Sequence, residues 1–309
     1  MAIANKHNFG YISPADFNLY AKQAQLDLFE NYFYRYNDWI NKQNARVSGS
    51  GYADAVKNLE EVIDTFSVED ALYKSQYNNY LIPNEDNNTH PYYLLNKVMV
   101  YQDVVTDGVT DGVLGGNAIV DSTKDFVSLG VSIGDYVGIQ FNDSILFLSV
   151  TSLSGNNTLF VDSSIINASG KQYSIYKYST TLKEAERVSH SKISMLNASN
   201  LTGPKINTPA YTQSELTVSL HPNTIDSIGQ VRAQYIRKPK DPKWTYTNLS
   251  GGEPAFDQGS SDYQDFELPA SDEPRLISKI LQYVGISIRE ADVYQAGTNE
   301  EVKTTQKQG

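Results

Sequence analysis

The chain has 309 residues, with 36 acidic and 25 basic side chains and a formal net charge of −11. This length suits one large domain or two to three smaller ones, and 40% hydrophobic with 20% charged residues is typical of a folded globular protein. Because there is no cysteine, disulfide frameworks, thiolate metal sites and cysteine nucleophiles are excluded. The surplus of acid argues against a protein that wraps or reads nucleic acid. We expect neither a signal peptide nor a membrane-spanning segment.

The first segment is predicted to be helical. Ser13 can cap a helix that starts with a proline, and apolar residues follow at helical spacing, which predicts a long helix over residues 14–44. After a Ser/Gly break at 48–51, a second helix is predicted over 52–66, so that the two form a helical hairpin. The aromatic face of the long helix is a candidate interface, comprising Phe29, Phe33, Tyr36 and Trp39.

The middle of the chain has a different composition. There is no Glu between Asp86 and Glu184 and no Arg between Arg46 and Arg187, while Val, Ile, Gly, Ser and Asn are plentiful. Runs typical of short strands, separated by Gly, Asn and Asp, cover residues 97–105, 136–141, 145–152, 158–161 and 172–178. We therefore predict a small β-barrel or sandwich module.

The last segment mixes strand and helix signals. Strands are predicted over 215–220 and 230–236, a loop rich in Pro, Lys and Gly follows, and Ser271 is expected to cap a further helix. The fold class is thus α+β. Three consecutive domains are predicted: a helical domain (1–96), an inserted β-rich module (97–180) and a mixed C-terminal domain with a terminal helix and polar tail (181–309).

The search for catalytic chemistry is mostly negative. The sequence has no Gly-x-Ser-x-Gly elbow and no phosphate-binding loop, and its four histidines are isolated. Asp103, Asp107 and Asp111 could gather around calcium, but they lack EF-hand spacing, and a solvated acidic loop is the alternative. A pair of catalytic carboxylates stays open, because its members need not be adjacent in sequence. We predict no catalytic residue, no metal site and no cofactor.

One basic cluster and the polar tail are the remaining candidates for an interface. The cluster could contact phosphate, or the acidic surface of a neighbouring subunit, or be a solvated loop that its prolines keep out of regular structure. It comprises Arg232, Arg237, Lys238, Lys240 and Lys243, next to Trp244 and Tyr246. The tail has little apolar area to bury, and we expect it to dock on a neighbouring subunit or on another ring through its backbone and through Glu300, Glu301 and Lys303.

Two stretches carry a resemblance to phage structural proteins. Residues 119–137, IVDSTKDFVSLGVSIGDYV, resemble a recurrent β-rich module with the pattern D-S-x-x-D-F-x-x-x-G-V-x-x-G-D-x-V. Residues 235–246, YIRKPKDPKWTY, together with the DFEL sequence at 265–268 and the following helix, resemble the C-terminal half of head–tail connector proteins. The chain resembles the ring or adaptor proteins beneath the portal of crAss-like phages, and it is more distantly similar to gatekeeper-type adaptors of short-tailed phages. Residues 12–46 fit the long N-terminal helix of such proteins.

The resemblance implies a virion structural protein and not an enzyme. It implies a ring, most often of twelve subunits, that joins the portal to the tail at the head–tail junction and lets DNA pass without specific binding. The implied partners are further copies, the portal and other tail ring proteins, with assembly in the host cytoplasm and no membrane contact. Composition leaves two alternatives open. With 22 tyrosines and an acidic balance, the chain could be a tail protein that binds or degrades host surface carbohydrate, although no fixed repeat occurs. An ordinary cytoplasmic enzyme is the other, with no positive feature to support it.

Overall fold

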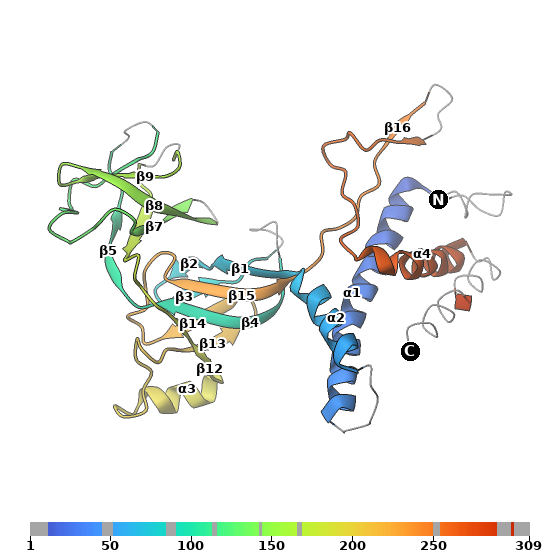
Figure 1. Cartoon of the computed structure of the whole chain (residues 1–309), viewed down its shortest axis with the longest axis horizontal. Helices are drawn as coiled ribbons and strands as arrows, with labels where there is room; N and C mark the ends of the chain where they lie inside the picture. Colours follow the sequence, from blue (N-terminus) through green and yellow to red (C-terminus); the bar gives the residue numbers. More distant parts are fainter. Residues whose placement is uncertain are drawn as a thin grey trace. The chain divides into compact units, whose positions relative to one another are not determined.

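The structure is a computed structural model that describes residues 12–44, 52–84, 91–112, 116–141, 144–165, 169–249, 254–288 and 298–299. The chain divides into two compact units (Figure 1). Met1–Phe66 and Pro239–Gly309 form the first, here called the helical unit, and Ser67–Lys238 form the second, the β unit. The β unit is therefore inserted between two parts of the helical unit. These limits differ from the three consecutive domains predicted from composition, whose breaks fall after residues 96 and 180.

The helical unit contains the predicted long helix. Helix α1 spans Pro14–Asn44 and α2 spans Tyr52–Asp64. The Ser13 hydroxyl accepts a hydrogen bond from the Asp16 backbone N–H at 3.1 Å, and it donates one to the Asp16 carboxylate at 2.6 Å. This cap, with proline at the first helical position, explains why α1 begins where the sequence predicts.

Helix α4 (Glu273–Ile288) packs on α1, directly after a short 3₁₀ turn, η2 (Ala270–Asp272), that contains Ser271. Small side chains on α1 allow the close approach. The shared core comprises Ile12, Ala21, Ala24 and Leu28 with Leu276, Ile280 and Val284. Another face of α1 packs against the residues just after α2. There the rings of Phe29 and Phe66 lie edge to face, with centroids 5.0 Å apart.

A long connection, residues 239–268, lies along α1 and carries a hairpin of β16 (Tyr246–Asn248) and β17 (Pro254–Phe256). In Figure 1 this hairpin extends away from the helices of its unit. Buried Gln25 on α1 fixes the connection at two points, because its side chain donates to the Lys240 carbonyl at 2.7 Å and accepts from the Glu267 backbone N–H at 3.0 Å.

The β unit begins with two sheets that share one core. The four-stranded sheet has the order β1-β15-β4-β11, and the five-stranded sheet has the order β12-β13-β14-β3-β2. Their strands are β1 (Ser67–Ala71), β2 (Tyr73–Gln76), β3 (Asn79–Leu81), β4 (Tyr92–Tyr101), β11 (Leu182–Glu184), β12 (Glu186–Arg187), β13 (Ala210–Ser214), β14 (Thr217–His221) and β15 (Val231–Arg237), with helix α3 (His190–Asn197) between β12 and β13.

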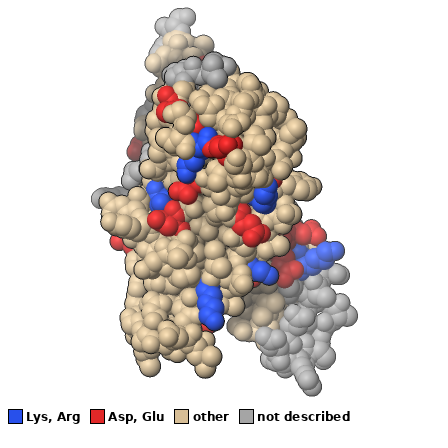
Figure 2. Space-filling model, turned by 90° about the vertical axis from the view of Figure 1, so that its left-hand side faces the viewer, with Lys and Arg blue, Asp and Glu red and all other residues tan. Residues whose placement is uncertain are grey.

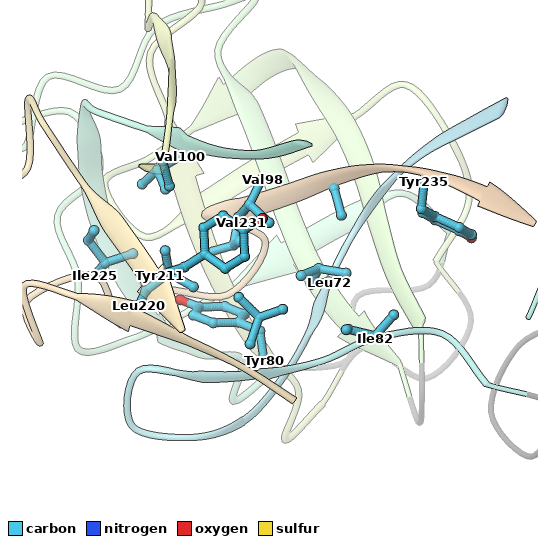
Figure 3. Close-up of a cluster of buried hydrophobic side chains, with 13 residues drawn as sticks. Leu72, Tyr80, Ile82, Val98, Val100, Tyr211, Leu220, Ile225, Val231 and Tyr235 are labelled. Carbon is cyan, nitrogen blue, oxygen red and sulfur yellow. The ribbon is translucent and has the colours of Figure 1, made fainter. Parts of the chain in front are cut away.

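Strands β1 to β4 show where the predicted organisation differs from the structure. Most of their residues fall inside the predicted helical domain, yet β1 and β4 pair with β15, and β3 pairs with β14. These partners are more than 100 residues away in sequence, so local pattern does not reveal them. Figure 3 shows the resulting core, which includes Leu72, Tyr80, Ile82, Val98, Val100, Tyr211, Leu220, Ile225, Val231 and Tyr235.

The third sheet confirms the predicted β-rich module in the middle of the chain. Six antiparallel strands in the order β5-β10-β7-β8-β9-β6 form a half-barrel. A hydrogen bond from the Asp111 backbone N–H to the Val120 carbonyl, at 3.0 Å, joins the ends of its two edge strands. The strands are β5 (Val104–Val109), β6 (Ala118–Val120), β7 (Tyr136–Phe141), β8 (Ser144–Ser154), β9 (Thr158–Val161) and β10 (Gln172–Tyr176).

Candidate interaction site

The motif within residues 119–137, D-S-x-x-D-F-x-x-x-G-V-x-x-G-D-x-V, has a structural role in the half-barrel. Its first aspartate, Asp121, is buried and accepts a hydrogen bond from the Tyr173 hydroxyl at 2.7 Å. Burial, and after it this hydrogen bond, raises the pKa of Tyr173 well above its ordinary value. The last aspartate, Asp135, is also buried and pairs with Lys177 at 3.0 Å. Gly134 takes a φ of +92°, a conformation that favours glycine. The motif therefore specifies turns and buried pairs of the module.

The three aspartates considered for calcium do not form such a site in the part of the chain that the structure describes. Asp111 accepts hydrogen bonds from the hydroxyl and backbone N–H of Ser122, and the hydroxyl bond is the main cause that lowers the pKa of Asp111. Among the described residues, no group of three or more His, Asp or Glu side chains is arranged to hold a metal ion.

Two of the histidines lie closer together than the sequence indicates. His190 is 3.1 Å from the Ser214 hydroxyl, and burial, followed by the charge of His190, lowers the pKa of His221. Within the described residues, no carboxylate is hydrogen-bonded to His190 to orient its ring. The Ser–His contact thus lacks the third member of a hydrolase triad.

The predicted aromatic interface on α1 is largely internal. Phe29 is fully buried against Phe66, so its assignment to an intermolecular surface is wrong for the folded chain. Phe33, Tyr36 and Trp39 are half-buried. The Tyr36 hydroxyl donates to Glu60 of α2 at 3.0 Å, and this bond is the main cause that raises the pKa of Tyr36. Phe29 and Tyr36 therefore help to hold the second part of the helical hairpin against α1.

The predicted basic cluster is divided by the fold. Arg237 and Lys238 belong to the β unit, whereas Lys240 and Lys243 belong to the helical unit. Neighbouring acids neutralise part of it, since Arg232 pairs with Glu69 at 3.0 Å and Lys243 pairs with Asp262. A cluster that is divided between two units and partly paired with acids is not the continuous basic patch that phosphate binding requires. On the face of the molecule drawn in Figure 2, which lies on the left in Figure 1, basic and acidic side chains also lie among a mostly uncharged surface.

Trp244 is part of a cluster of stacked aromatic rings at the surface of the helical unit. Its ring stacks on Tyr246 and Phe256, with centroid distances of 5.6 and 6.2 Å and interplanar angles of 19° and 13°. Tyr246 and Phe256 are 45% and 50% exposed, and Leu249, which directly follows β16 in sequence, is 56% exposed. We call this hairpin surface, comprising Trp244, Tyr246, Leu249 and Phe256, the aromatic arm. The sequence singled out Trp244 and Tyr246, but Phe256 joins them only through the pairing of β16 and β17.

The base of the aromatic arm is fixed to α1. The Asn18 amide donates to the Trp244 carbonyl at 3.2 Å and accepts from the Trp244 backbone N–H at 2.8 Å. The Lys243 backbone N–H donates to the Gln264 carbonyl at 2.8 Å, which joins the two sides of the arm. The exposed rings are thus held in position before any partner binds, which lowers the entropy cost of association.

A second apolar feature of the helical unit is a groove beside α4. It has a volume of about 590 Å³, and the loop before η2, α1 and α4 all contribute to it. Ile277 in this groove is 44% exposed, which is unusual for a large aliphatic side chain next to other apolar residues. We call it the α4 groove; its main apolar residues are Phe17, Phe266, Leu268, Leu276, Ile277 and Leu281.

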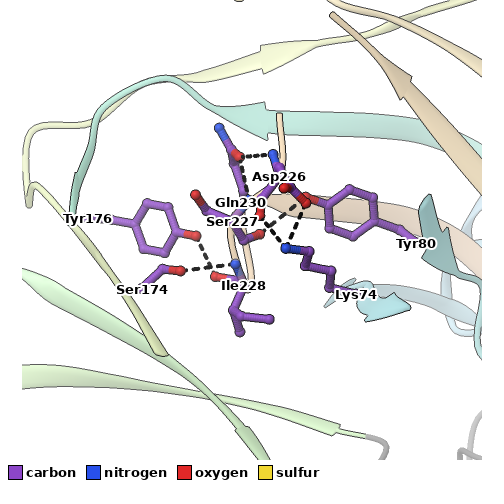
Figure 4. Close-up of polar contacts among 8 residues, drawn as sticks. All are labelled: Lys74, Tyr80, Ser174, Tyr176, Asp226, Ser227, Ile228 and Gln230. Atoms are coloured by element: carbon purple, nitrogen blue, oxygen red, sulfur yellow. Dashed lines mark hydrogen bonds and ion pairs between the residues drawn. The ribbon is translucent and has the colours of Figure 1, made fainter. Parts of the chain in front are cut away.

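The β unit has a buried polar junction that sequence reasoning missed (Figure 4). In the loop between β14 and β15, the Ile228 backbone N–H donates to the Ser174 hydroxyl at 3.0 Å, and its carbonyl accepts from the Tyr176 hydroxyl. The Gln230 side chain accepts from the backbone N–H groups of two further loop residues, both at 3.0 Å. The loop is thereby attached to the half-barrel, and its partners are about 50 residues away in sequence.

A polar cavity of about 540 Å³ also lies in the β unit. Tyr77 at its edge is 78% exposed and has a φ of +47°, which is uncommon for a residue other than glycine. The remaining lining residues are mostly amides, hydroxyls and lysines, including Tyr73, Ser75, Gln76, Gln140, Lys171 and Gln172.

Comparison with known proteins adds no family. No protein-family model matches the chain, and a search of curated proteins finds no match to its sequence. None of the described helices is long and apolar enough to cross a membrane. The candidate tail residues Glu300, Glu301 and Lys303 lie outside the described residues.

Proposed function

We propose that the chain is a structural subunit of a ring at the head–tail connector of a bacteriophage, beneath the portal, where it links capsid to tail and lines the DNA channel. One observation carries the proposal: the helical unit has both an exposed aromatic arm and an apolar groove on the same chain. The resemblance of residues 119–137 and 235–246 to phage proteins supplies the biological context.

Two different apolar surfaces on one chain favour head-to-tail association. When the arm of one copy occupies the groove of the next, the contact is heterologous, and repeated rotation closes a ring. Aromatic side chains held in place are typical anchors of such interfaces. The net charge of −11 keeps the chain soluble before assembly in the host cytoplasm.

The charge also fits a channel for DNA. A ring of twelve copies would carry on the order of −130 charges in total, twelve times −11, before counterions bind. A surface of this sign repels phosphate, so that DNA slides through without sticking. Neither catalysis nor a cofactor is needed for this role, and the partners are further copies, the portal and other tail rings.

The polar cavity of the β unit favours a second candidate, a tail protein that binds or degrades host surface carbohydrate. Exposed Tyr77 beside amide side chains offers a stacking face and hydrogen-bond partners, which is the chemistry of sugar recognition. No repeat typical of trimeric tail fibres accompanies it.

The experiment that tests the first proposal compares assembly of two variants of the full chain. Tyr246→Ser with Phe256→Ser removes both exposed rings of the aromatic arm, whereas Tyr178→Ser with Leu201→Ser removes two residues of the β unit that are 71% and 87% exposed. Light scattering in the presence of purified portal should show rings for the wild type and the control but not for the arm variant. Equal assembly by all three chains would contradict the proposal. Binding to host glycans with a stable trimer would favour the second candidate.

A further inference from the structure

A small ionic cluster is buried where α1 meets the start of α4. The Tyr32 hydroxyl donates to Oδ2 of Asp272 at 2.6 Å, and Nη1 of Arg275 is 3.4 Å from Oδ1 of the same carboxylate. Tyr32, Asp272 and Arg275 are only 2%, 6% and 5% exposed. Arg35 follows Tyr32 by three positions, which places it on the same face of α1.

This cluster has more positive than negative charge, because the two arginines Arg35 and Arg275 lie near the single carboxylate of Asp272. Nε of Arg275 is buried without a hydrogen-bond partner, and Arg35 makes no hydrogen bond or ion pair with any other residue that the structure describes. Burial, and next the charge of Arg275, lowers the pKa of Arg35, but a guanidinium still stays protonated in proteins. Burial, and next the bond to Asp272, raises the pKa of Tyr32, so it stays neutral. Two guanidinium groups therefore share one carboxylate.

An unbalanced charge of this kind calls for an anion. Buried charges are normally paired, and an unpaired one costs stability. The planar arginine fork matches a carboxylate, to which it can donate two parallel hydrogen bonds. Within the helical hairpin, the Glu60 carboxylate of α2 already accepts a hydrogen bond from the Tyr36 hydroxyl. Arg35 is half-buried, so an anion can reach it from solvent.

We propose that Arg35, backed by Arg275, forms a carboxylate-binding site that an acidic side chain of a second copy of the chain occupies. The choice of a second copy rests on the proposed ring and on charge complementarity: the chain has 36 acidic against 25 basic residues, so a neighbouring copy presents carboxylates in excess. The site adds a polar contact to the apolar arm and groove.

The first experiment tests the site on the isolated chain, independently of any ring. Thermal unfolding is measured in sodium acetate and in sodium chloride at equal ionic strength, for the wild type, Arg35→Gln and the control Arg187→Gln. Arg187 is an exposed arginine of the β unit, so the control loses the same charge. The acetate concentration is chosen well above the dissociation constant of acetate at this site. The Tm of the wild type and of the control should then be about 2 °C higher in acetate than in chloride, whereas the Tm of Arg35→Gln should be the same in both salts. An equal response of all three chains would overturn the site.

The second experiment tests the second copy as the occupant. Sedimentation at increasing chain concentration should show association at least about tenfold weaker for Arg35→Gln than for Arg187→Gln. Equal association, with the acetate response intact, would leave a site for small carboxylates and overturn the second copy. A wild-type chain that does not associate under any condition, with portal present, would overturn both the second copy and the proposed ring, whereas the acetate comparison still decides the site.

Discussion

The hydroxyl of Tyr173 donates a hydrogen bond to Asp121 at 2.7 Å inside the half-barrel, and the two residues are 52 positions apart in sequence. The bond links the D-S-x-x-D-F motif to β10. Asp121 also accepts from the backbone N–H and the hydroxyl of Thr123, at 3.0 and 2.5 Å. A carboxylate that is 1% exposed is thus satisfied on both oxygens, which is the condition for burying its charge.

Tyr173→Phe should destabilise the β unit. The substitution keeps the ring but leaves a buried carboxylate oxygen without its donor, which costs about 1.5–3 kcal/mol. Urea unfolding followed by tyrosine fluorescence measures the loss. Tyr178→Phe serves as the control, because Tyr178 is 71% exposed, and its unfolding midpoint should stay the same. Equal midpoints for Tyr173→Phe and the wild type would show that the bond contributes nothing.

The buried tyrosines predict a loss of stability at high pH. Burial is the main cause that raises the pKa of Tyr235, to about 12, against an ordinary value of 10.0. Below pH 10 both states keep the proton, so this contribution is fully present. Between pH 10 and 12 the unfolded chain loses the proton and the folded chain keeps it, so each such tyrosine lowers the free energy of unfolding by about 1.4 kcal/mol per pH unit.

The variant that checks this pH dependence is Tyr235→Phe. It should reduce the slope of unfolding free energy against pH by about 1.4 kcal/mol per unit between pH 10 and 12. Tyr34→Phe, at a side chain 75% exposed, should leave the slope unchanged. Identical slopes for the two variants would contradict the assigned cause.

Gly229→Ala should destabilise the junction between the half-barrel and the rest of the β unit. Gly229 has a φ of +72°, and an added Cβ would lie 2.7 Å from the Phe147 ring. That ring is held by Tyr176, at a centroid distance of 6.2 Å, and by Arg232 above it at 5.5 Å, so it has little freedom to move. Strained backbone and overlap together should cost about 2–5 kcal/mol.

Gly155→Ala is the matched control for this effect. Its φ of +65° is similar, but an added Cβ has nothing within 4 Å, so only the backbone cost of about 1–2 kcal/mol is expected. Thermal unfolding of both variants separates the two contributions. A Gly229 variant no less stable than the Gly155 variant would mean that Phe147 moves aside.

The chain should not bind duplex DNA at physiological salt. The net charge is −11, and the predicted basic cluster is split between two units and partly paired with acids. A fluorescence anisotropy titration should show no binding at micromolar protein. Salt-dependent binding in that range, lost in a Lys240→Gln variant, would instead identify the connection as a phosphate site.

Local signals explain what the sequence predicts well. Ser13 and the following proline specify the start of α1, and the Gly- and Asn-rich breaks delimit the strands of the half-barrel. The assignment of Phe29 to an interface failed because a helical pattern marks an apolar face without telling what covers it; here Phe66 does.

The features that the sequence did not predict rest on contacts between residues far apart in the chain. The predicted helical domain includes β1 to β3 and the first half of β4, because β1 and β4 pair with β15, and β3 with β14, more than 100 residues later in the sequence. The aromatic arm needed the pairing of β16 and β17 to bring Phe256 to Trp244, and the cluster around Asp272 needed the packing of α4 on α1. No local spacing in the sequence encodes these contacts.

The connector proposal implies that a phage encodes this chain, and its most direct test is to locate and count the chain in intact virions. Mass spectrometry of purified particles shows whether the chain is present. Electron cryomicroscopy with symmetry analysis of the head–tail junction then gives its location and copy number. The proposal predicts a ring of twelve copies directly beneath the portal, with the aromatic arm of each copy against its neighbour. Three copies at the tip of a tail fibre, or purified particles without the chain, would contradict it.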